Sequence, residues 1–146
     1  MRARVALLGM ACSAVLVGAA CGSSTHPQRG PVLTVTDKDF NIALSPSHVP
    51  AGWVNVNVFN QGPDTHEVIL VRSKRAEGTL PLRHDGITVD EEGLEAQTVT
   101  TVDDLLPGRH RTLRLYLKPG SYELFCNMSG HYRTGMHTIL IVTATS

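Results

Sequence analysis

Three metal-donor side chains stand at equal intervals near the C-terminal end, and this spacing constrains the fold more than any other feature. Four residues separate Cys126 from His131, four more separate His131 from Met136, and a second histidine, His66, lies sixty residues upstream of the cysteine. Thiolate and thioether donors favour Cu(I), whereas imidazole accepts both copper oxidation states. The combination of these four side chains therefore predicts a copper site suited to a one-electron couple.

The run from Cys126 to Met136 resembles the metal loop of the cupredoxins, the small blue copper proteins. Its spacing is most similar to the rusticyanin, auracyanin and sulfocyanin group, because plastocyanin-like loops are shorter after the cysteine and azurin-like loops are shorter before the methionine. The resemblance implies one type 1 copper ion as cofactor. Its ligands would be His66, Cys126 and His131 in a plane, with Met136 as a long axial contact.

The same resemblance implies a route for electrons. In this family the C-terminal histidine ligand lies near the surface in an apolar patch, so His131 is expected to be the electron port, flanked by Met128 and Tyr132. The expected function is one-electron transfer between redox partner proteins, and the protein is not expected to be an enzyme. Copper sequestration or delivery is the alternative, although the chain has none of the methionine-rich or histidine-rich tails that would favour it.

Alternating apolar and polar residues predict the fold. Over 54–58 three valines alternate with asparagines, over 113–117 three leucines alternate with arginine and tyrosine, and a similar pattern covers 40–44. A period of two with frequent glycine and proline breaks is typical of strands in an antiparallel sandwich. We therefore predict an all-β, Greek-key antiparallel β-sandwich, cupredoxin-like, with about eight strands.

Strand periodicity also indicates where the donors point. His66 shares the parity of Val68 and Leu70, so it should face the same apolar interior. Cys126 likewise shares the parity of Tyr122 and Leu124. Each donor would thus stand at the end of a strand and point toward a common core.

Residues 73–97 do not follow a strand pattern. The segment is rich in charged residues and glycine, and it is expected to be a solvated insertion between two strands. A short helical turn within 90–97 is the one helical element that the sequence predicts. The remaining histidines of the mature chain are not expected to be ligands. They lie in polar turns, except for His137, which would face the opposite side of its strand from Met136.

The N-terminal segment predicts export. Arg2 and Arg4 precede an apolar stretch over 5–20 that is too short to span a bilayer, which is typical of a signal peptide at 1–20. The following Cys21 ends a sequence that resembles a bacterial lipoprotein box, so it is the candidate lipidation site. Ordinary cleavage that leaves Cys21 unmodified is the alternative.

These features divide the chain into a signal peptide at 1–20, a lipidated tether at 21–31 and a copper-binding domain at 32–146. The chain is expected outside the cytoplasm, anchored to the outer face of the cytoplasmic membrane or periplasmic. Without Arg2 and Arg4, the count of Lys and Arg falls from 13 to 11 against 13 Asp and Glu, so the mature chain has a net charge near −2. Because a slightly negative chain has no excess of basic residues to attract phosphates, nucleic acid is not expected as a partner.

Overall fold

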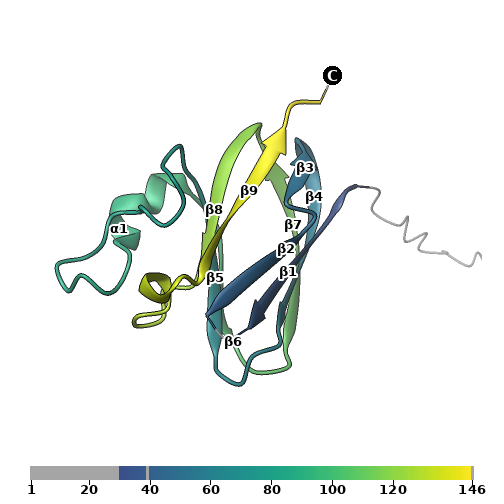
Figure 1. Ribbon diagram of the computed structural model, residues 1–146. Coiled ribbons are helices and arrows are strands. Elements are labelled where there is room, and N and C mark those ends of the chain that lie inside the picture. The colour runs from purple at the N-terminus through teal and green to yellow at the C-terminus, as the bar shows by residue number, and fades with distance from the viewer. Residues whose placement is uncertain (1–29, 39, 146) are drawn as a thin grey trace, which may run out of the picture.

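The computed structural model describes residues 30–38 and 40–145. The predicted signal peptide, Cys21 and all but the last residues of the tether lie outside the described residues. Nine strands form two facing sheets (Figure 1). The strands are β1 (Val32–Lys38), β2 (Asn41–Ser45), β3 (His48–Pro50), β4 (Gly52–Asn60), β5 (His66–Arg72), β6 (Thr98–Leu105), β7 (His110–Leu117), β8 (Gly120–Phe125) and β9 (His137–Thr143).

The sheets have the strand orders β2-β1-β4-β7 and β3-β9-β8-β5-β6, which confirms the predicted all-β sandwich. Two pairings are parallel, however, so both sheets are mixed rather than purely antiparallel. β1 pairs with β4, and the short β3 pairs with the last strand, β9. The parallel register of β1 on β4 makes the chain enter the first sheet beside the start of β4.

The main core lies between the two sheets and follows the predicted alternation. Val54, Val56 and Val58 of β4 point inward and are almost completely buried. They pack in one cluster with Val68 and Leu70 of β5. Burying each such side chain contributes roughly 1.5–3 kcal/mol, so this cluster is a principal source of the stability that fixes the strand ends.

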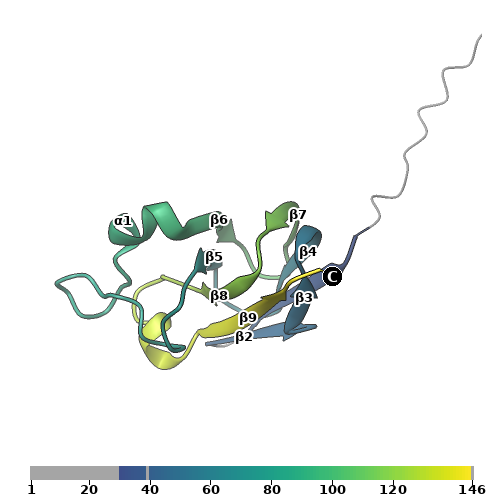
Figure 2. The ribbon, with the colours of Figure 1, turned by 90° about the horizontal axis from the view of Figure 1, so that it is seen from above.

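The expectation that the insertion between β5 and β6 is solvated is only partly correct, because some of its side chains are buried. The insertion projects from one side of the sandwich (Figures 1 and 2) and contains the predicted helical turn as α1 (Glu91–Leu94) and η1 (Glu95–Gln97). Three of its apolar side chains are buried and form an outer cluster against the second sheet. This outer cluster comprises Leu80, Val89 and Leu94 of the insertion with Ile69, Val71, Phe125 and Tyr132.

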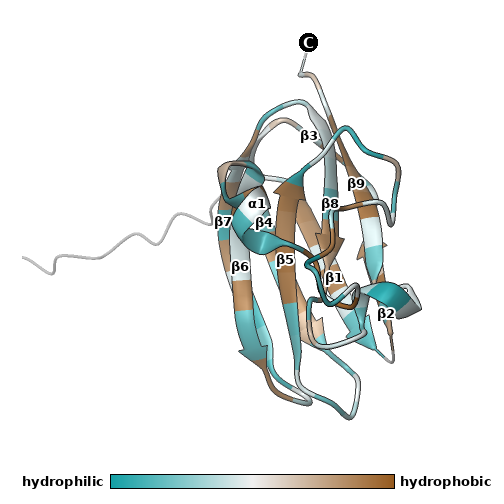
Figure 3. Ribbon diagram, turned by 90° about the vertical axis from the view of Figure 1, so that its left-hand side faces the viewer, coloured by the Kyte–Doolittle hydropathy of each residue, from teal (hydrophilic) through white to brown (hydrophobic). Residues whose placement is uncertain are grey.

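Strand β5 is consequently covered on both faces. Its residues from Val68 to Val71 are all buried, and the strand is apolar over most of its length (Figure 3). A continuous apolar run of this kind is typical of a strand packed on two sides. None of the helices among the described residues is long and apolar enough to span a membrane.

Candidate metal centre

Strand pairing brings the predicted donors together at one end of the sandwich. β5 begins at His66, and β8 ends at Phe125, immediately before Cys126. The two strands are antiparallel neighbours, with Leu70 opposite Leu124, so the start of one lies beside the end of the other. The predicted parity is also confirmed, because Cys126 and its neighbours of equal parity are buried in the main core.

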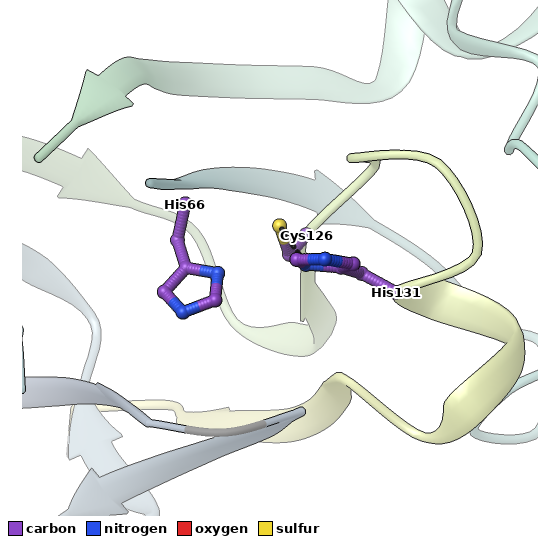
Figure 4. A group of neighbouring side chains, drawn as sticks. All are labelled: His66, Cys126 and His131. Carbon is purple, nitrogen blue, oxygen red and sulfur yellow. Dashed lines mark hydrogen bonds between the residues drawn. The ribbon is translucent and has the colours of Figure 1, made fainter. Parts of the chain in front are cut away.

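Three donor side chains converge in space (Figure 4). The donor atoms of His66, Cys126 and His131 all lie within 4.8 Å of one another. The Sγ atom of Cys126 is 3.4 Å from Nδ1 of His131. Donor atoms bound to a single ion at about 2.0–2.3 Å are separated by roughly 3.5 Å, so this geometry fits one ion between the three side chains.

Backbone hydrogen bonds fix the loop that carries the other donors. The N–H of His131 donates to the carbonyl of Met128 at 2.9 Å, and the N–H of Met136 donates to the carbonyl of His131 at 3.0 Å. Gly135 ends the short 3-10 turn η2 (Tyr132–Thr134) with φ of 102°, a conformation that glycine accepts readily. Met136 is fully buried and belongs to the same core cluster as Cys126.

The protein environment alone does not favour a thiolate. Burial raises the pKa of Cys126 to about 11, although the backbone N–H groups of Glu67 and Met128 act in the opposite direction. A bound cation removes the proton from a coordinating thiol, because its charge stabilises the thiolate far more than these dipoles do. The site therefore has the electrostatic character of a metal site rather than that of a reactive cysteine.

The ring of His131 is partly accessible, and an unexpected aromatic side chain lies against it. Burial lowers the pKa of His131, and the charge of Asp64 partly offsets this effect. The ring of Phe40 meets that of His131 edge-on, with centroids 5.0 Å apart. Phe40 is 47% exposed and Met128 is 40% exposed, so both contribute apolar surface at this end of the molecule.

Tyr132 does not flank the port, contrary to the resemblance-based expectation. It is only 4% exposed, because the 3-10 turn that follows His131 directs its side chain into the outer cluster. There its hydroxyl donates to Oε1 of Glu123 at 3.1 Å and accepts from the N–H of Leu80 at 2.9 Å. Phe40, not Tyr132, is the exposed aromatic side chain beside His131. This contact could not be predicted from the alternating pattern over 40–44, because Phe40 has a positive φ of 62° and does not continue a regular strand.

The insertion braces the metal loop through Asn127. The side-chain oxygen of Asn127 accepts from the N–H of Val89 at 2.6 Å, and its amide donates to the carbonyl of Val89 and to Oε1 of Glu91. These bonds tie the residue after Cys126 to a segment nearly forty positions upstream. Sequence reasoning missed this brace because nothing in the pattern of 73–97 indicated that its backbone would be buried.

The other histidines that the structure describes lie as expected, whereas His26 lies outside the described residues. His48, His84 and His110 are exposed. His137 faces away from the donors, with Nδ1 3.4 Å from Glu77, and its ring lies 5.0 Å from that of Tyr132. Among the described residues, the one group of three or more histidine, cysteine or acidic side chains with metal-binding geometry is the one described above.

Comparisons with known proteins agree with this geometry. The profile of the sulfocyanin (SoxE) domain matches residues 39–146. The fold is similar to auracyanin from Roseiflexus castenholzii, with a TM-score of 0.57 and 21% identity over 78% of this chain and 98% of the other. It is also similar to rusticyanin from Thiobacillus ferrooxidans, with a TM-score of 0.55 and 16% identity over 79% of each chain. A comparison with curated protein sequences found no significant match.

Proposed function

The chain belongs to the sulfocyanin (SoxE) domain family of cupredoxins, whose cofactor is one type 1 copper ion, and we propose that it carries single electrons between redox proteins outside the cytoplasm. The observation that carries this proposal is the convergence of a buried thiol with two imidazoles. We assign His66, Cys126 and His131 as the planar ligands and Met136 as the axial one. Copper bound there supplies a reversible one-electron couple.

The surroundings of the donors favour electron transfer over copper delivery. Each donor is held by the fold: His66 by its strand, Cys126 and Met136 by the main core, and His131 by the loop hydrogen bonds. Donors that cannot move far between oxidation states make electron exchange fast and metal release slow. A delivery protein needs the opposite behaviour, because its donors must leave the ion one at a time.

The route for electrons is the apolar surface around His131. This imidazole is partly accessible, whereas Cys126 and Met136 are fully buried and His66 nearly so. Phe40 lies against its ring, and Met128, whose carbonyl accepts from the N–H of His131, is exposed; both are uncharged side chains that a partner could cover without desolvating an ion. We therefore propose that redox partners dock over His131.

Two measurements on the copper-loaded chain test the proposal. The oxidised protein should absorb intensely in the visible range, through charge transfer from the Cys126 thiolate, and a fully loaded but pale protein would contradict the type 1 assignment. Electron self-exchange should be fast, while transfer of Cu(I) to a copper-free acceptor protein should be slow. Rapid metal handover with slow self-exchange would instead establish copper delivery.

The proposed location rests on the N-terminal sequence. The basic start, the short apolar segment and the Cys21 that follows it favour export and attachment of a lipid to Cys21. An exported carrier with a lipid anchor would remain at the outer face of the membrane, and its cupredoxin domain would follow a tether ending near Pro31.

A further inference from the structure

The polypeptide enters the domain at the end opposite the metal centre. The N–H of Asn55 donates to the carbonyl of Pro31 at 2.9 Å, and a Cβ placed on Gly30 would come within 2.8 Å of the carbonyl oxygen of Trp53. The tether thus arrives beside the first residues of β4. The metal centre lies beyond the last residues of β4, where the loop after Asn60 leads to His66. The long axis of the sandwich separates the two ends (Figure 1).

An exposed aromatic pair lies beside this entry point. Trp53 is 52% exposed and Tyr116 is 58% exposed, and their rings meet edge-on with centroids 5.6 Å apart. The guanidinium of Arg114 lies over the Trp53 ring, 4.9 Å from its centroid. Large aromatic side chains are usually much more buried than this in soluble domains. Tryptophan and tyrosine are enriched where a protein meets the headgroup region of a bilayer.

Basic side chains extend the aromatic pair into a charged surface. A cavity of about 410 Å³ is lined by Tyr116, Lys118 and Arg72, and a neighbouring groove of about 660 Å³ shares Arg72 and adds Lys74 and Arg75. No aspartate or glutamate is among the described residues that line either hollow. We call the aromatic pair, Arg114 and these hollows the basic aromatic surface.

The end that carries the metal centre has exposed charges of both signs. Asp64, Asp103 and Asp104 are exposed in the segments that flank His66 and its partner Leu105. Arg109 and Arg111 are exposed at the start of β7, beside the end of β4. An anionic surface would therefore meet mixed charges at this end, whereas the hollows beside the tether offer basic side chains without acidic ones.

We propose that the basic aromatic surface lies on the headgroups of an anionic membrane. Trp53 and Tyr116 would enter the interfacial region, while Arg114, Lys118 and Arg72 would meet lipid phosphates. The proposal extends the proposed membrane location but does not require lipidation. Where Cys21 is lipidated, the nine residues to Gly30 reach at most roughly 30 Å, which keeps this surface close to the bilayer.

Vesicle binding by the copper-loaded chain that begins at Gly22 tests the proposal. This chain keeps every described residue and lacks the lipid acceptor, so its behaviour does not depend on lipidation. We expect it to sediment with phosphatidylcholine vesicles that contain about one third phosphatidylglycerol, and to bind pure phosphatidylcholine about tenfold or more weakly. Trp53 is the one tryptophan of the sequence, so its fluorescence should shift to the blue on binding.

Charge variants in and next to the two ends of β7 provide a matched comparison. Arg114→Gln with Lys118→Gln should weaken binding to the anionic vesicles by about tenfold or more. Arg109→Gln with Arg111→Gln removes the same charge near the other end of β7 and should have little effect. Retention of the visible absorption band would show that both variants are folded. Equal binding to neutral vesicles, equal effects of the two double variants, or an unshifted Trp53 emission would each overturn the proposal. So would binding of this surface to a redox protein without any binding to vesicles.

Discussion

The N–H of Cys126 donates to the carbonyl oxygen of Met136 at 3.1 Å, so one backbone hydrogen bond joins the two ends of the metal loop. Both residues are fully buried, and both belong to the main core. The thiol and the thioether are therefore positioned by the backbone and by packing. Site substitutions should change the chemistry of the centre more than its architecture.

Replacing the two sulfur ligands should have different effects. Cys126→Ser should abolish the intense visible band, because the charge transfer requires a thiolate. Met136→Leu should keep the band and raise the reduction potential, since loss of the weak axial donor destabilises Cu(II) more than Cu(I). Absorption spectroscopy and voltammetry of copper-loaded protein check both. A Met136→Leu protein with an unchanged potential would remove Met136 from the proposed ligand set.

Changes at the surface of the proposed port should alter electron exchange without removing copper. Met128→Glu places a charge where a partner must dock and should slow electron self-exchange by about tenfold, equivalent to about 1.4 kcal/mol in activation free energy. Phe40→Ala should make the edge of His131 more accessible and speed the loss of copper to a chelator. Ala144→Glu adds the same charge at an exposed position just after the end of β9, away from the metal loop where that strand begins, and serves as the control. Similar rates in Met128→Glu and wild type would contradict docking at this surface.

Asn127→Ala should destabilise the fold by about 1–3 kcal/mol, because it leaves the buried N–H of Val89 without its partner. Urea unfolding of the copper-free chain measures the loss. Ser129→Ala, two positions along the same loop at an exposed site, should change the free energy of unfolding by less than about 0.5 kcal/mol. If the two variants are equally stable, the brace between the metal loop and the insertion contributes nothing.

Asp37 should make the copper-free chain less stable as the pH rises. Its side chain is fully buried, neither carboxylate oxygen has a hydrogen-bond partner among the described residues, and burial raises its pKa from 3.8 to about 7. Between these values the unfolded chain has lost the proton that the folded chain still holds. Stability from this group is thus complete below pH 4 and is lost as the pH approaches 7, by about 4 kcal/mol.

Asp37→Asn should remove this part of the pH dependence. The copper-free variant should be more stable than the wild type at pH 8, with a flatter profile between pH 4 and 7, as measured by urea unfolding at several pH values. Glu67 and Glu123 also have raised pKa values through burial and should leave a smaller slope of the same sign. An identical profile in the two proteins would show that Asp37 is ionised in the fold.

Lipidation should depend on Cys21 alone. Metabolic labelling with a fatty-acid probe should tag the wild-type chain, and Cys21→Ala should lose the tag because the thiol that accepts the lipid is absent. Cys12→Ala, which changes a cysteine inside the predicted signal peptide, should keep it. Unlabelled wild-type protein would instead support ordinary signal cleavage before an unmodified cysteine.

The sequence predicted the sandwich and the convergence of three donors because both depend on short-range patterns. A period of two fixes which side chains face the core, and the regular spacing after Cys126 is a property of one loop. The parallel pairings of β1 and β3 were not foreseen, because strand partners far apart in sequence leave no local signal.

The contacts that surround the donors were the least predictable part of the site. The burial of Leu80 and Val89 within a charged, glycine-rich segment depends on an apolar outer face of the second sheet, which periodicity along 73–97 cannot reveal. Tyr132 was misplaced for a similar reason. The turn after His131 decides whether its neighbour faces solvent or the interior, and that turn is set by tertiary hydrogen bonds.

Phe125 and Cys126 are adjacent in the chain but belong to different apolar clusters, the first to the outer cluster and the second to the main core. A rearrangement that shifts the backbone of Phe125 also moves the peptide unit that positions the sulfur. Because the visible colour depends on the geometry of that sulfur, the chromophore acts as an optical reporter for packing beneath the insertion. Replacing Leu80 by a smaller side chain would loosen the outer cluster and shift the absorption maximum under conditions in which the sandwich remains folded.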